Sequence, residues 1–394
     1  LLFARTWTQR ASIPTPRWYP ASVVVDEKIY VIGGQDSTEP YSSLNTIEVY
    51  DPIQDTWETK RPMINDRWGL MTAVVNGKIY AIGGRTGSFT GGHSPTNVVE
   101  EYNPISDTWI PKSLMPTARG YGGCGVFHDT IYVFGGRAGS TVSMVEKYCP
   151  ANDSWSSDPS MLNPRYTFAT AFLNDRFYLI GGWNTTYVEE YNPITKVWTV
   201  KASMTTARGG SGVGVINGKI FVVGGRGGNS NELESYDPVN DTWRTWNPMP
   251  TAREGLTAGV VDNKLYCITG SVPINQGGLP YYGENEVAEG LAGIDEDVIR
   301  PSNDNTFLLR FSNPFNTSNP IYYRLIKDGN INLAVYDALG HKVKLLINKY
   351  QKAGDYSIQW DGKDTNGEKL SNGIYFLKLD GKGYSAIKNI LLLR

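Results

Sequence analysis

Residues 29–35 read Ile-Tyr-Val-Ile-Gly-Gly-Gln (IYVIGGQ), an apolar run that ends in two glycines. Such a run is either a strand feeding a glycine-rich phosphate loop or part of a structural repeat. A dinucleotide-binding loop needs the pattern G-x-G-x-x-G at the start of a helix. Residues 36–40 read Asp-Ser-Thr-Glu-Pro, which is no start of an amphipathic helix. The two glycines alone therefore do not choose between the two interpretations.

The same pair of glycines recurs at 83–84, 135–136, 181–182 and 224–225, with Thr269-Gly270 as a diverged sixth copy. A tryptophan lies 26 residues before the first position of each copy: Trp7, Trp57, Trp109, Trp155, Trp198 and Trp243. A tyrosine lies seven residues before five of these tryptophans: Tyr50, Tyr102, Tyr148, Tyr191 and Tyr236. Self-similarity with a period of 43–52 residues indicates a repeat architecture.

Each repeat is predicted to contain four strands. In the second repeat the four segments are 69–78, 78–84, 97–104 and 107–112, and the signals between them are Asn-Gly, Gly-Gly and Asn-Pro-x-x-Asp. No helical period occurs in residues 1–270. A four-stranded unit of this size cannot bury both of its faces alone, whereas units placed radially bury one another, as in a β-propeller.

These motifs resemble Kelch repeats, in the apolar run into Gly-Gly, the separated Tyr and Trp, and the arginine of PTARGY (116–121), TTARGG (205–210) and PTAREG (250–255). The resemblance implies an all-β fold with a six-bladed propeller over residues 1–294. Its last blade would be closed by the N-terminal strand that carries Trp7. The third strand of that blade is then expected at residues 285–289 (NEVAE), which resemble residues 231–235 (NELES).

An arginine lies ten residues after each repeated tryptophan, and a glutamate lies two residues before each of the five tyrosines. Six arginines could form an anion-binding ring. A matched arginine and glutamate in every repeat is better explained by structural ion pairs, because partly buried charges need partners. The residues are Arg17, Arg67, Arg119, Arg165, Arg208 and Arg253, with Glu48, Glu100, Glu146, Glu189 and Glu234.

Positions that differ between repeats at one end of the propeller are the candidates for ligand specificity. They are the residue after each Gly-Gly and the first or second residue after each repeated arginine. The resemblance implies that ligand contacts come from this same face, as they do in Kelch domains that bind peptides. The predicted ligand-binding residues are Trp18, Tyr19, Gln35, Trp68, Arg85, Tyr121, Arg137, Tyr166, Trp183, Arg226 and Glu254, and the loops add Tyr41, Phe89, His93 and Tyr187.

Composition and scattered reactive residues argue against several classes of function. A net charge of −2 predicts no nucleic-acid surface, and the absence of an apolar run of about 18 residues predicts no membrane span. The histidines lack metal-ligand spacing, and the cysteines lack CxxC spacing and lie in apolar runs typical of small buried hydrophobic residues, so no metal and no cofactor is expected. These residues are His93, His128, His341, Cys124, Cys149 and Cys267.

Catalysis has no clear set of residues in this sequence. Glycoside hydrolysis needs two facing carboxylates, and nothing in the sequence pairs the candidates Asp36, Glu39, Asp66 and Glu254. No nucleophile elbow supports Ser-His-Asp chemistry. The sequence therefore favours a protein that is not an enzyme.

The pattern changes near residue 295, where a polar and acidic stretch at 295–304 predicts a linker. Residues 305–394 contain seven short alternating segments, which predict an Ig-like β-sandwich. Segments 312–325, 331–346, 354–379 and 387–394 resemble the C-terminal sorting domain of type IX secretion cargo, and WDGKDTNG at 360–367 is also similar to the Ig-like domain of flagellar hook-capping proteins. In DGKDTNGE (361–368) the spacing does not fit a calcium loop, and a turn in which Asp361 or Asp364 accepts backbone N–H groups is expected.

These resemblances predict a secreted or cell-surface protein of a Gram-negative, Bacteroidetes-type or related bacterium, with the type IX secretion machinery as one partner. The propeller is expected to recognise an extracellular protein or a glycan through its loop-rich face. Two alternatives stay open. One is a self-associating structural subunit of an extracellular assembly or surface layer, and the other is a carbohydrate-active enzyme on a Kelch scaffold.

Overall fold

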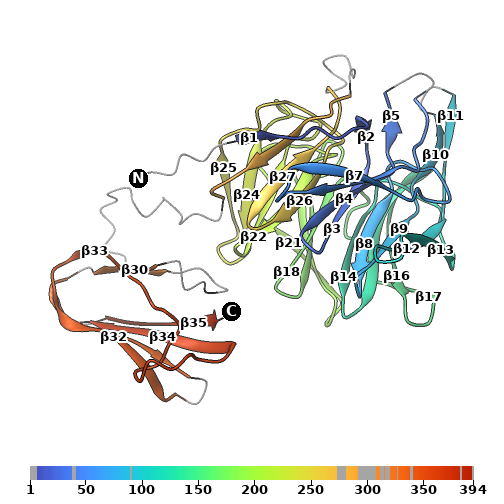
Figure 1. The fold of residues 1–394 in the computed structure, drawn as a ribbon. Helices are drawn as coiled ribbons and strands as arrows, with labels where there is room; N and C mark the ends of the chain where they lie inside the picture. Colours follow the sequence, from blue (N-terminus) through green and yellow to red (C-terminus); the bar gives the residue numbers. More distant parts are fainter. Residues whose placement is uncertain are drawn as a thin grey trace. The chain divides into compact units, whose positions relative to one another are not determined.

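The computed structural model describes residues 7–37, 41–88, 91–272, 281–291, 308–310, 315, 320–325, 327–337, 340–381 and 384–392. The chain divides into two compact units, residues 1–292 and 293–394. Among the described residues every regular element is a β-strand, as the sequence predicts (Figure 1). The linker expected at 295–304 lies outside the described residues.

The described part of the first unit contains six four-stranded antiparallel sheets. The first sheet contains β3 (Ala21–Val25), β4 (Lys28–Ile32), β6 (Ile47–Asp51) and β7 (Thr56–Lys60), and the second β8 (Met71–Val75), β9 (Lys78–Ile82), β12 (Val99–Asn103) and β13 (Thr108–Lys112). The third contains β14 (Gly123–Phe127), β15 (Thr130–Ala138), β16 (Ser140–Cys149) and β17 (Ser154–Asp158), and the fourth β18 (Ala169–Leu173), β19 (Arg176–Ile180), β20 (Val188–Asn192) and β21 (Val197–Lys201). The fifth contains β22 (Gly212–Ile216), β23 (Lys219–Val223), β24 (Leu233–Asp237) and β25 (Thr242–Trp246), and the sixth β26 (Thr257–Val261), β27 (Lys264–Ile268), β28 (Asn285–Ala288) and β1 (Trp7–Arg10).

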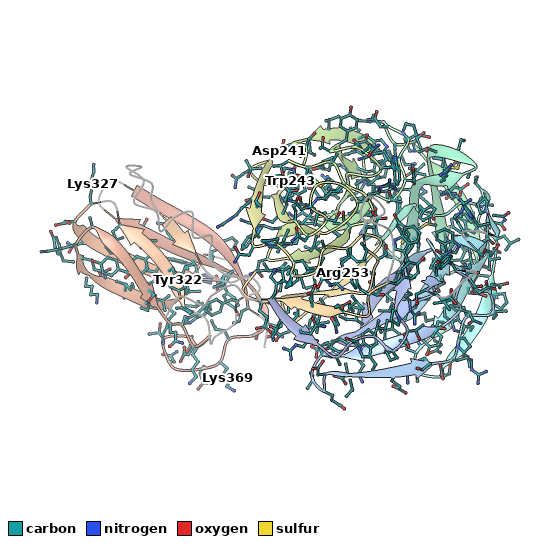
Figure 2. The ribbon with its side chains drawn as sticks, turned by 90° about the horizontal axis from the view of Figure 1, so that it is seen from above. Asp241, Trp243, Arg253, Tyr322, Lys327 and Lys369 are labelled. Atoms are coloured by element: carbon teal, nitrogen blue, oxygen red, sulfur yellow. The ribbon has the colours of Figure 1, made fainter. Side chains whose placement is uncertain are left out.

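The sheets are arranged around a common axis, which is visible in the view from above (Figure 2). The first strands of successive sheets are in contact in the order β3, β8, β14, β18, β22, β26 and again β3. In the described residues of this unit, six hydrophobic clusters each lie between two neighbouring sheets. Sheets of this kind bury one another, because no single sheet has a core of its own.

The sixth sheet joins the two ends of the unit. Strand β1 pairs antiparallel with β28, with Trp7 opposite Ala288 and Arg10 opposite Asn285. The segment 285–289 therefore supplies the strand that the sequence assigns to it. In the structure Glu286 lies opposite Cys267 as Glu234 lies opposite Val222. This pairing shifts the segment by two residues from the alignment of NEVAE with NELES.

Each repeated pair of glycines follows the second strand of its sheet. There it contacts the connection that leads from the fourth strand of the same sheet to the first strand of the next sheet. Gly33 and Gly34 have φ of +62° and +107°, and a Cβ on Gly33 would lie 2.5 Å from the carbonyl oxygen of Arg67. The Gly34 N–H donates to that carbonyl at 2.9 Å, and the same bond recurs at every sheet. A side chain is therefore excluded by both conformation and contact. The other pairs are Gly84–Arg119, Gly136–Arg165, Gly182–Arg208, Gly225–Arg253 and Gly270–Arg17.

The repeated tryptophans tie each sheet to the one before it. Trp57 Nε1–H donates to the Ala11 carbonyl at 2.8 Å and Trp109 Nε1–H to the Arg61 carbonyl at 3.0 Å. The remaining four indoles donate in the same way to Asn247, Ser113, Pro159 and Ala202. These residues thus serve packing and hydrogen bonding within the scaffold.

The repeated tyrosines donate to an aspartate in the following turn, as Tyr102 does to Asp107 at 2.7 Å. In the fourth sheet Lys196 occupies the position of that aspartate. Tyr191 there donates to Asp158 of the third sheet at 2.5 Å. The neighbouring sheet thus supplies the hydrogen-bond acceptor for Tyr191 that the following turn lacks.

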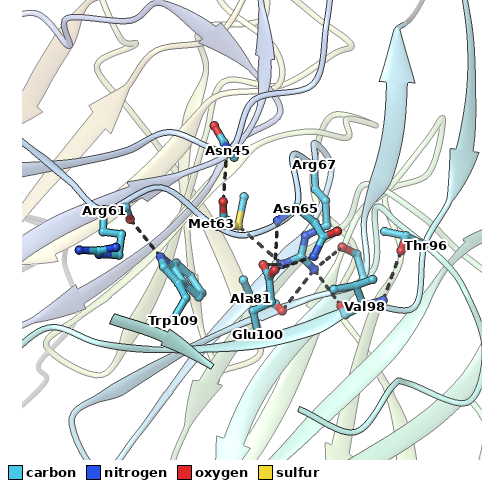
Figure 3. Close-up of polar contacts among 11 residues, drawn as sticks. Asn45, Arg61, Met63, Asn65, Arg67, Ala81, Thr96, Val98, Glu100 and Trp109 are labelled. Carbon is cyan, nitrogen blue, oxygen red and sulfur yellow. Dashed lines mark hydrogen bonds and ion pairs between the residues drawn. The ribbon is translucent and has the colours of Figure 1, made fainter. Parts of the chain in front are cut away.

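The arginine–glutamate pairs expected from the repeat are present, as Figure 3 shows for Arg67 and Glu100. Their Nη2 and Oε2 atoms are 2.5 Å apart, and both side chains are fully buried. Arg67 also donates to the carbonyls of Ala81, Gly83 and Val98. The other pairs are Arg17–Glu48, Arg119–Glu146, Arg165–Glu189 and Arg208–Glu234, and a sixth pair that the sequence pattern missed is Arg253–Glu286.

The described part of the second unit contains two sheets. One has the order β29 (Leu308–Arg310), β30 (Ile321–Leu325) and β33 (Gly354–Ile358). The other has the order β32 (Lys342–Gln351), β31 (Gly329–Tyr336), β34 (Gly373–Gly381) and β35 (Tyr384–Leu392). They share one core around Trp360, which gives a sandwich. In the 361–368 turn Asp364 accepts the N–H groups of Asn366 and Glu368, so the expected Asp turn is confirmed.

Candidate functional site

A closed ring of backbone hydrogen bonds lies where the six connections carrying the repeated arginines meet. Each member is the second residue after a repeated arginine, and each donates its N–H to the carbonyl of the member before it at 2.7–3.0 Å. All six have φ between +48° and +66°, a conformation that L-residues rarely adopt. In order the members are Tyr19, Gly69, Tyr121, Thr167, Gly210 and Gly255, and Tyr19 closes the ring by donating to Gly255.

The two sets of variable positions predicted as a ligand face are brought together around this ring. Short strands β2 (Arg17–Trp18) and β5 (Gln35–Asp36) pair Trp18 with Gln35. The hairpin of β10 (Arg85–Ser88) and β11 (Gly92–Pro95) starts at Arg85, which exchanges two backbone hydrogen bonds with Trp68. Bridges of the same kind join Gly120 to Arg137, Gly209 to Arg226 and Glu254 to Ser271, and the Trp183 N–H donates to the Tyr166 carbonyl. We call the eleven predicted ligand-binding residues the loop face.

The loop face has a buried floor and an accessible rim, which the sequence did not separate. Five residues expected to contact ligand are at most 7% exposed: Trp18, Gln35, Trp68, Arg85 and Glu254. Arg137 and Trp183 are exposed, whereas Tyr19, Tyr121, Tyr166 and Arg226 are half-buried. Five of the eleven predicted ligand-binding residues are therefore buried in this structure, while ligand binding by the loop face stays a prediction. The physical reason for this burial is that six chain segments converge on one axis, so that large side chains there cover one another.

An aromatic cluster forms this floor. Tyr19 and Tyr121 have ring centroids 5.0 Å apart, Trp68 meets Tyr121 edge-on at 5.6 Å, and Trp18 lies 6.1 Å from Trp68. Edge-to-face and offset arrangements of this kind are the favourable ones. Tyr281, which the sequence pattern did not single out, completes the cluster, and its hydroxyl donates to Gln35 Oε1 at 3.2 Å.

Glycines make room for these rings. A Cβ on Gly69 would lie 2.8 Å from the Tyr121 ring, and one on Gly255 would lie 2.3 Å from the Trp18 ring. Burial raises the pKa of the Tyr19 phenol, and the nearby Glu254 carboxylate raises this pKa further. Burial likewise raises the pKa of Tyr121 in spite of two nearby arginines. Both phenols are therefore neutral hydrogen-bonding groups at physiological pH.

Three loop-face arginines each lie over an aromatic ring. Arg85 lies 5.9 Å from the centre of the Tyr121 ring, and Arg137 lies 5.7 Å from that of Tyr166. Arg226 lies 3.9 Å from the centre of a Trp183 ring, which also stacks on Tyr166 at 5.7 Å. Cation–π contacts of this kind hold both partners in place without neutralising the cation. The rim is thus rich in ordered Arg, Trp and Tyr side chains.

An open pocket of about 350 Å³ lies beside this rim, between the third and fourth sheets. Trp183 and Tyr187, 39% and 53% exposed, form its aromatic wall. Thr141, Asn163 and Thr185 add hydroxyl and amide groups. Such a combination of apolar area with a few polar groups is typical of a recognition surface.

The remaining predicted loop residues are less central. His93 is exposed and meets Trp68 edge-on at 5.4 Å, Tyr41 is half-buried, and Phe89 and Glu39 lie outside the described residues. Asp66 accepts a hydrogen bond from Ser43.

The reactive residues show no metal centre in the described part of the chain. No three His, Cys, Asp or Glu side chains cluster there with the geometry of a metal site. Of the cysteines, Cys267 is buried as expected, and Cys124 is half-buried and packs against the hydrophobic cluster between the second and third sheets. Cys149 is half-buried, so the expectation of burial is met only in part there. In the described residues no helix is long and apolar enough to span a membrane.

Comparison with known proteins agrees with this architecture. Residues 3–182 match the family described as the KLHDC2/KLHL20/DRC7 Kelch-repeats domain, and residues 164–205 and 207–250 match the Kelch motif. Residues 327–383 match the FlgD Ig-like domain. The chain is thus a Kelch-repeat protein with an Ig-like domain near its C-terminus.

Individual relatives are distant. Kelch-like protein 23 of Pongo abelii is 32% identical over 45% of this chain and 32% of its own length, and Beta-scruin of Limulus polyphemus is 28% identical over 47% of this chain and 21% of its own. This chain therefore spans about a third or less of the length of these relatives. A solved structure titled "Structure of YjhT" has a TM-score of 0.60 at 16% identity, covering 70% of this chain and 96% of that one, and shows the propeller fold alone.

Proposed function

We propose that residues 1–292 form a six-bladed Kelch propeller, closed by β1, that binds a protein partner through the loop face. The observation that carries this proposal is the rim itself. Exposed Trp183 and the ring-stacked Arg137 and Arg226 are residue types that anchor protein interfaces, and they lie beside a pocket of about 350 Å³ that Tyr187 also lines.

The rigidity of the loop face supports binding. The backbone ring and the ring-to-ring contacts hold the rim side chains before a partner arrives. A partner then avoids about 0.5–1.5 kcal/mol of ordering cost for each side chain that is already fixed. The buried floor excludes water beneath the contact surface, which is the environment in which interface anchors contribute most.

Selection from a phage-displayed library of random 12-residue peptides on the full chain tests this proposal. Enriched peptides should bind the Trp183→Ala variant about 30-fold or more weakly, since interface anchors of this kind contribute at least about 2 kcal/mol. Tyr350→Ala, which removes an aromatic side chain that is 63% exposed in the second unit, is the control and should bind normally. Failure to enrich any peptide, or full binding by Trp183→Ala, would refute the proposal.

Glycan recognition is a second candidate for the same rim. The pocket favours it, because exposed aromatic side chains next to Asn163 and two threonines can stack on a sugar ring and bind its hydroxyls. An immobilised glycan panel read with the wild type and Trp183→Ala separates the two candidates. Binding to one glycan that is lost in the variant, with no peptide enriched in the selection, would favour the glycan.

We further propose that residues 305–394 direct export by type IX secretion and place the propeller outside the cell. The resemblance of segments 312–325, 331–346, 354–379 and 387–394 to sorting domains supports this proposal. The match to an Ig-like domain agrees with the seven-stranded sandwich but carries no information on the export route.

A further inference from the structure

The fourth strand of each sheet lies furthest from the axis of the first unit and forms an open edge. In the described residues β21 (Val197–Lys201) pairs with β20 alone, and the fourth strands of the other sheets end their sheets in the same way. Such an edge presents unpaired backbone N–H and C=O groups to any strand that comes beside it. Proteins protect open edges with charged side chains, proline or short length, so an edge without this protection is a candidate for a contact.

Strand β21 differs from the other outer strands in its exposed side chains. Val197 and Val200 are 55% and 67% exposed, and Thr199 between them is exposed as well. Ile194, in the turn before β21, adds a third exposed apolar side chain. Valine and threonine are also residues that favour β-strands. The outer edge of the fourth sheet thus offers apolar area and strand-forming residues at the same place.

The other outer strands carry features that oppose or fail to support pairing with a copy of themselves. The position of Thr199, directly after the repeated tryptophan, is Glu58 in β7 and Arg244 in β25, and two copies of either strand would set like charges opposite each other. In β13 the position of Val200 is Pro111, which has no N–H to donate. The two corresponding residues in the remaining outer strands are polar and uncharged, Ser156 and Ser157 in β17 and Thr8 and Gln9 in β1.

An antiparallel copy of β21 fits the edge of β21. In a symmetric pairing Thr199 lies opposite the Thr199 of the second copy, and Trp198 then lies opposite Val200. Threonine–threonine and aromatic–valine pairs are favourable across antiparallel strands. The same register sets Val197 opposite Lys201, which is the one charged residue of β21. The two copies of this lysine lie at opposite ends of the pair, so no like charges face each other.

We propose that β21 pairs with the β21 of a second copy of this chain, so that the fourth sheets of two molecules join into one continuous sheet. Because each copy uses the same strand, the contact closes at two copies and does not extend into a filament. The inference does not depend on the proposed function, since β21 is the outer strand of its sheet and the loop face surrounds the axis. A dimer carries two loop faces, and a partner with repeated epitopes is bound more tightly through both.

Sedimentation equilibrium of the full chain, over a concentration series up to about 0.1 mM, tests the proposal. Thr199→Lys sets two ammonium groups opposite each other at the centre of the pairing, so the dissociation constant of the dimer should rise about tenfold or more. Thr199→Glu should raise this constant for the same reason. An equimolar mixture of the two variants sets opposite charges against each other and should restore dimers. Ser156→Lys, at the corresponding position of β17, is the matched control and should dimerise as the wild type does.

Recovery of dimers on mixing is the outcome that a damaged fold cannot produce. A wild type that stays monomeric over this range overturns the proposal, as does a dimer that persists unchanged in both Thr199 variants. Dimers that both variants lose and that the mixture does not recover overturn the pairing of Thr199 with itself. Peptides from the loop-face selection should bind Thr199→Lys as they bind the wild type, so the dimer and the binding function are judged by separate measurements.

Discussion

The buried pair of Arg67 and Glu100 makes a quantitative prediction about what holds neighbouring sheets together. Both side chains are fully buried, and Asn65 adds two hydrogen bonds to Glu100 Oε1. Arg67→Met leaves the Glu100 charge buried without its cation, and breaking a buried pair in this way costs about 3–5 kcal/mol of unfolding free energy. For a unit of this size the midpoint of thermal unfolding should fall by about 6–20 °C.

The double variant Arg67→Met with Glu100→Leu separates the charge from the hydrogen bonds. Replacing a buried pair with apolar side chains is often neutral or stabilising. Arg67 also satisfies the carbonyls of Ala81, Gly83 and Val98, which the double variant leaves without this donor. We therefore expect the double variant to recover only in part and to remain about 1–3 kcal/mol less stable than the wild type.

Urea unfolding of the full chain followed by tryptophan fluorescence measures these effects, because ten of the eleven tryptophans lie at or before residue 246. Arg61→Met, at an exposed arginine, is the control and should change stability by no more than about 0.5 kcal/mol. A loss below about 1 kcal/mol for Arg67→Met, or full recovery in the double variant, would show that the pair does not hold the sheets as argued.

Two further predictions concern acid stability and export. Hydrogen bonds from Tyr102 and from the Arg61 N–H hold the pKa of Asp107 below its usual value, so this carboxylate contributes stability above the unfolded-state pKa of about 3.9 that is lost as pH falls through the lower folded-state pKa. Urea midpoints of the wild type should therefore drop more steeply between pH 5 and pH 2 than those of Asp107→Asn, and parallel curves would contradict this assignment. A reporter fused to residues 305–394 should reach the medium or the cell surface of a bacterium that has type IX secretion. A chain truncated after residue 304 should stay inside the cell. Equal export of the truncated chain would exclude the sorting role.

Much of the scaffold follows from the sequence pattern. The spacing of Trp, Gly-Gly, Tyr and Arg predicts four strands in each repeat, and the structure has strands at these places, for example β8, β9, β12 and β13 in the second repeat. The pattern also predicts arginine–glutamate pairs, which are present. These features are predictable because each depends on short-range period and turn chemistry repeated at a constant distance along the chain.

The pattern was less informative where a partner comes from another sheet. Glu286 as the sixth glutamate was missed because Ala288 stands opposite Trp7, where the other sheets have the tyrosine that marked the motif. The partner of Tyr191 could not be predicted either, because Asp158 belongs to the third sheet and replaces an aspartate that the fourth lacks. In both cases the loss of a local signal is compensated by a contact that exists only in the assembled structure.

By itself the sequence determined the repeat, the all-β class, the end of the sheets at which the variable residues lie, and the residue types gathered there. Only the tertiary structure decided which of those residues a ligand can reach. Trp18, Gln35, Trp68, Arg85 and Glu254 belong to the same variable positions as Arg137 and Trp183, yet they form a buried floor. The physical reason is that burial at the axis depends on six segments converging from distant parts of the chain, and on the glycines at 69 and 255 that let the tyrosine and tryptophan rings close over it.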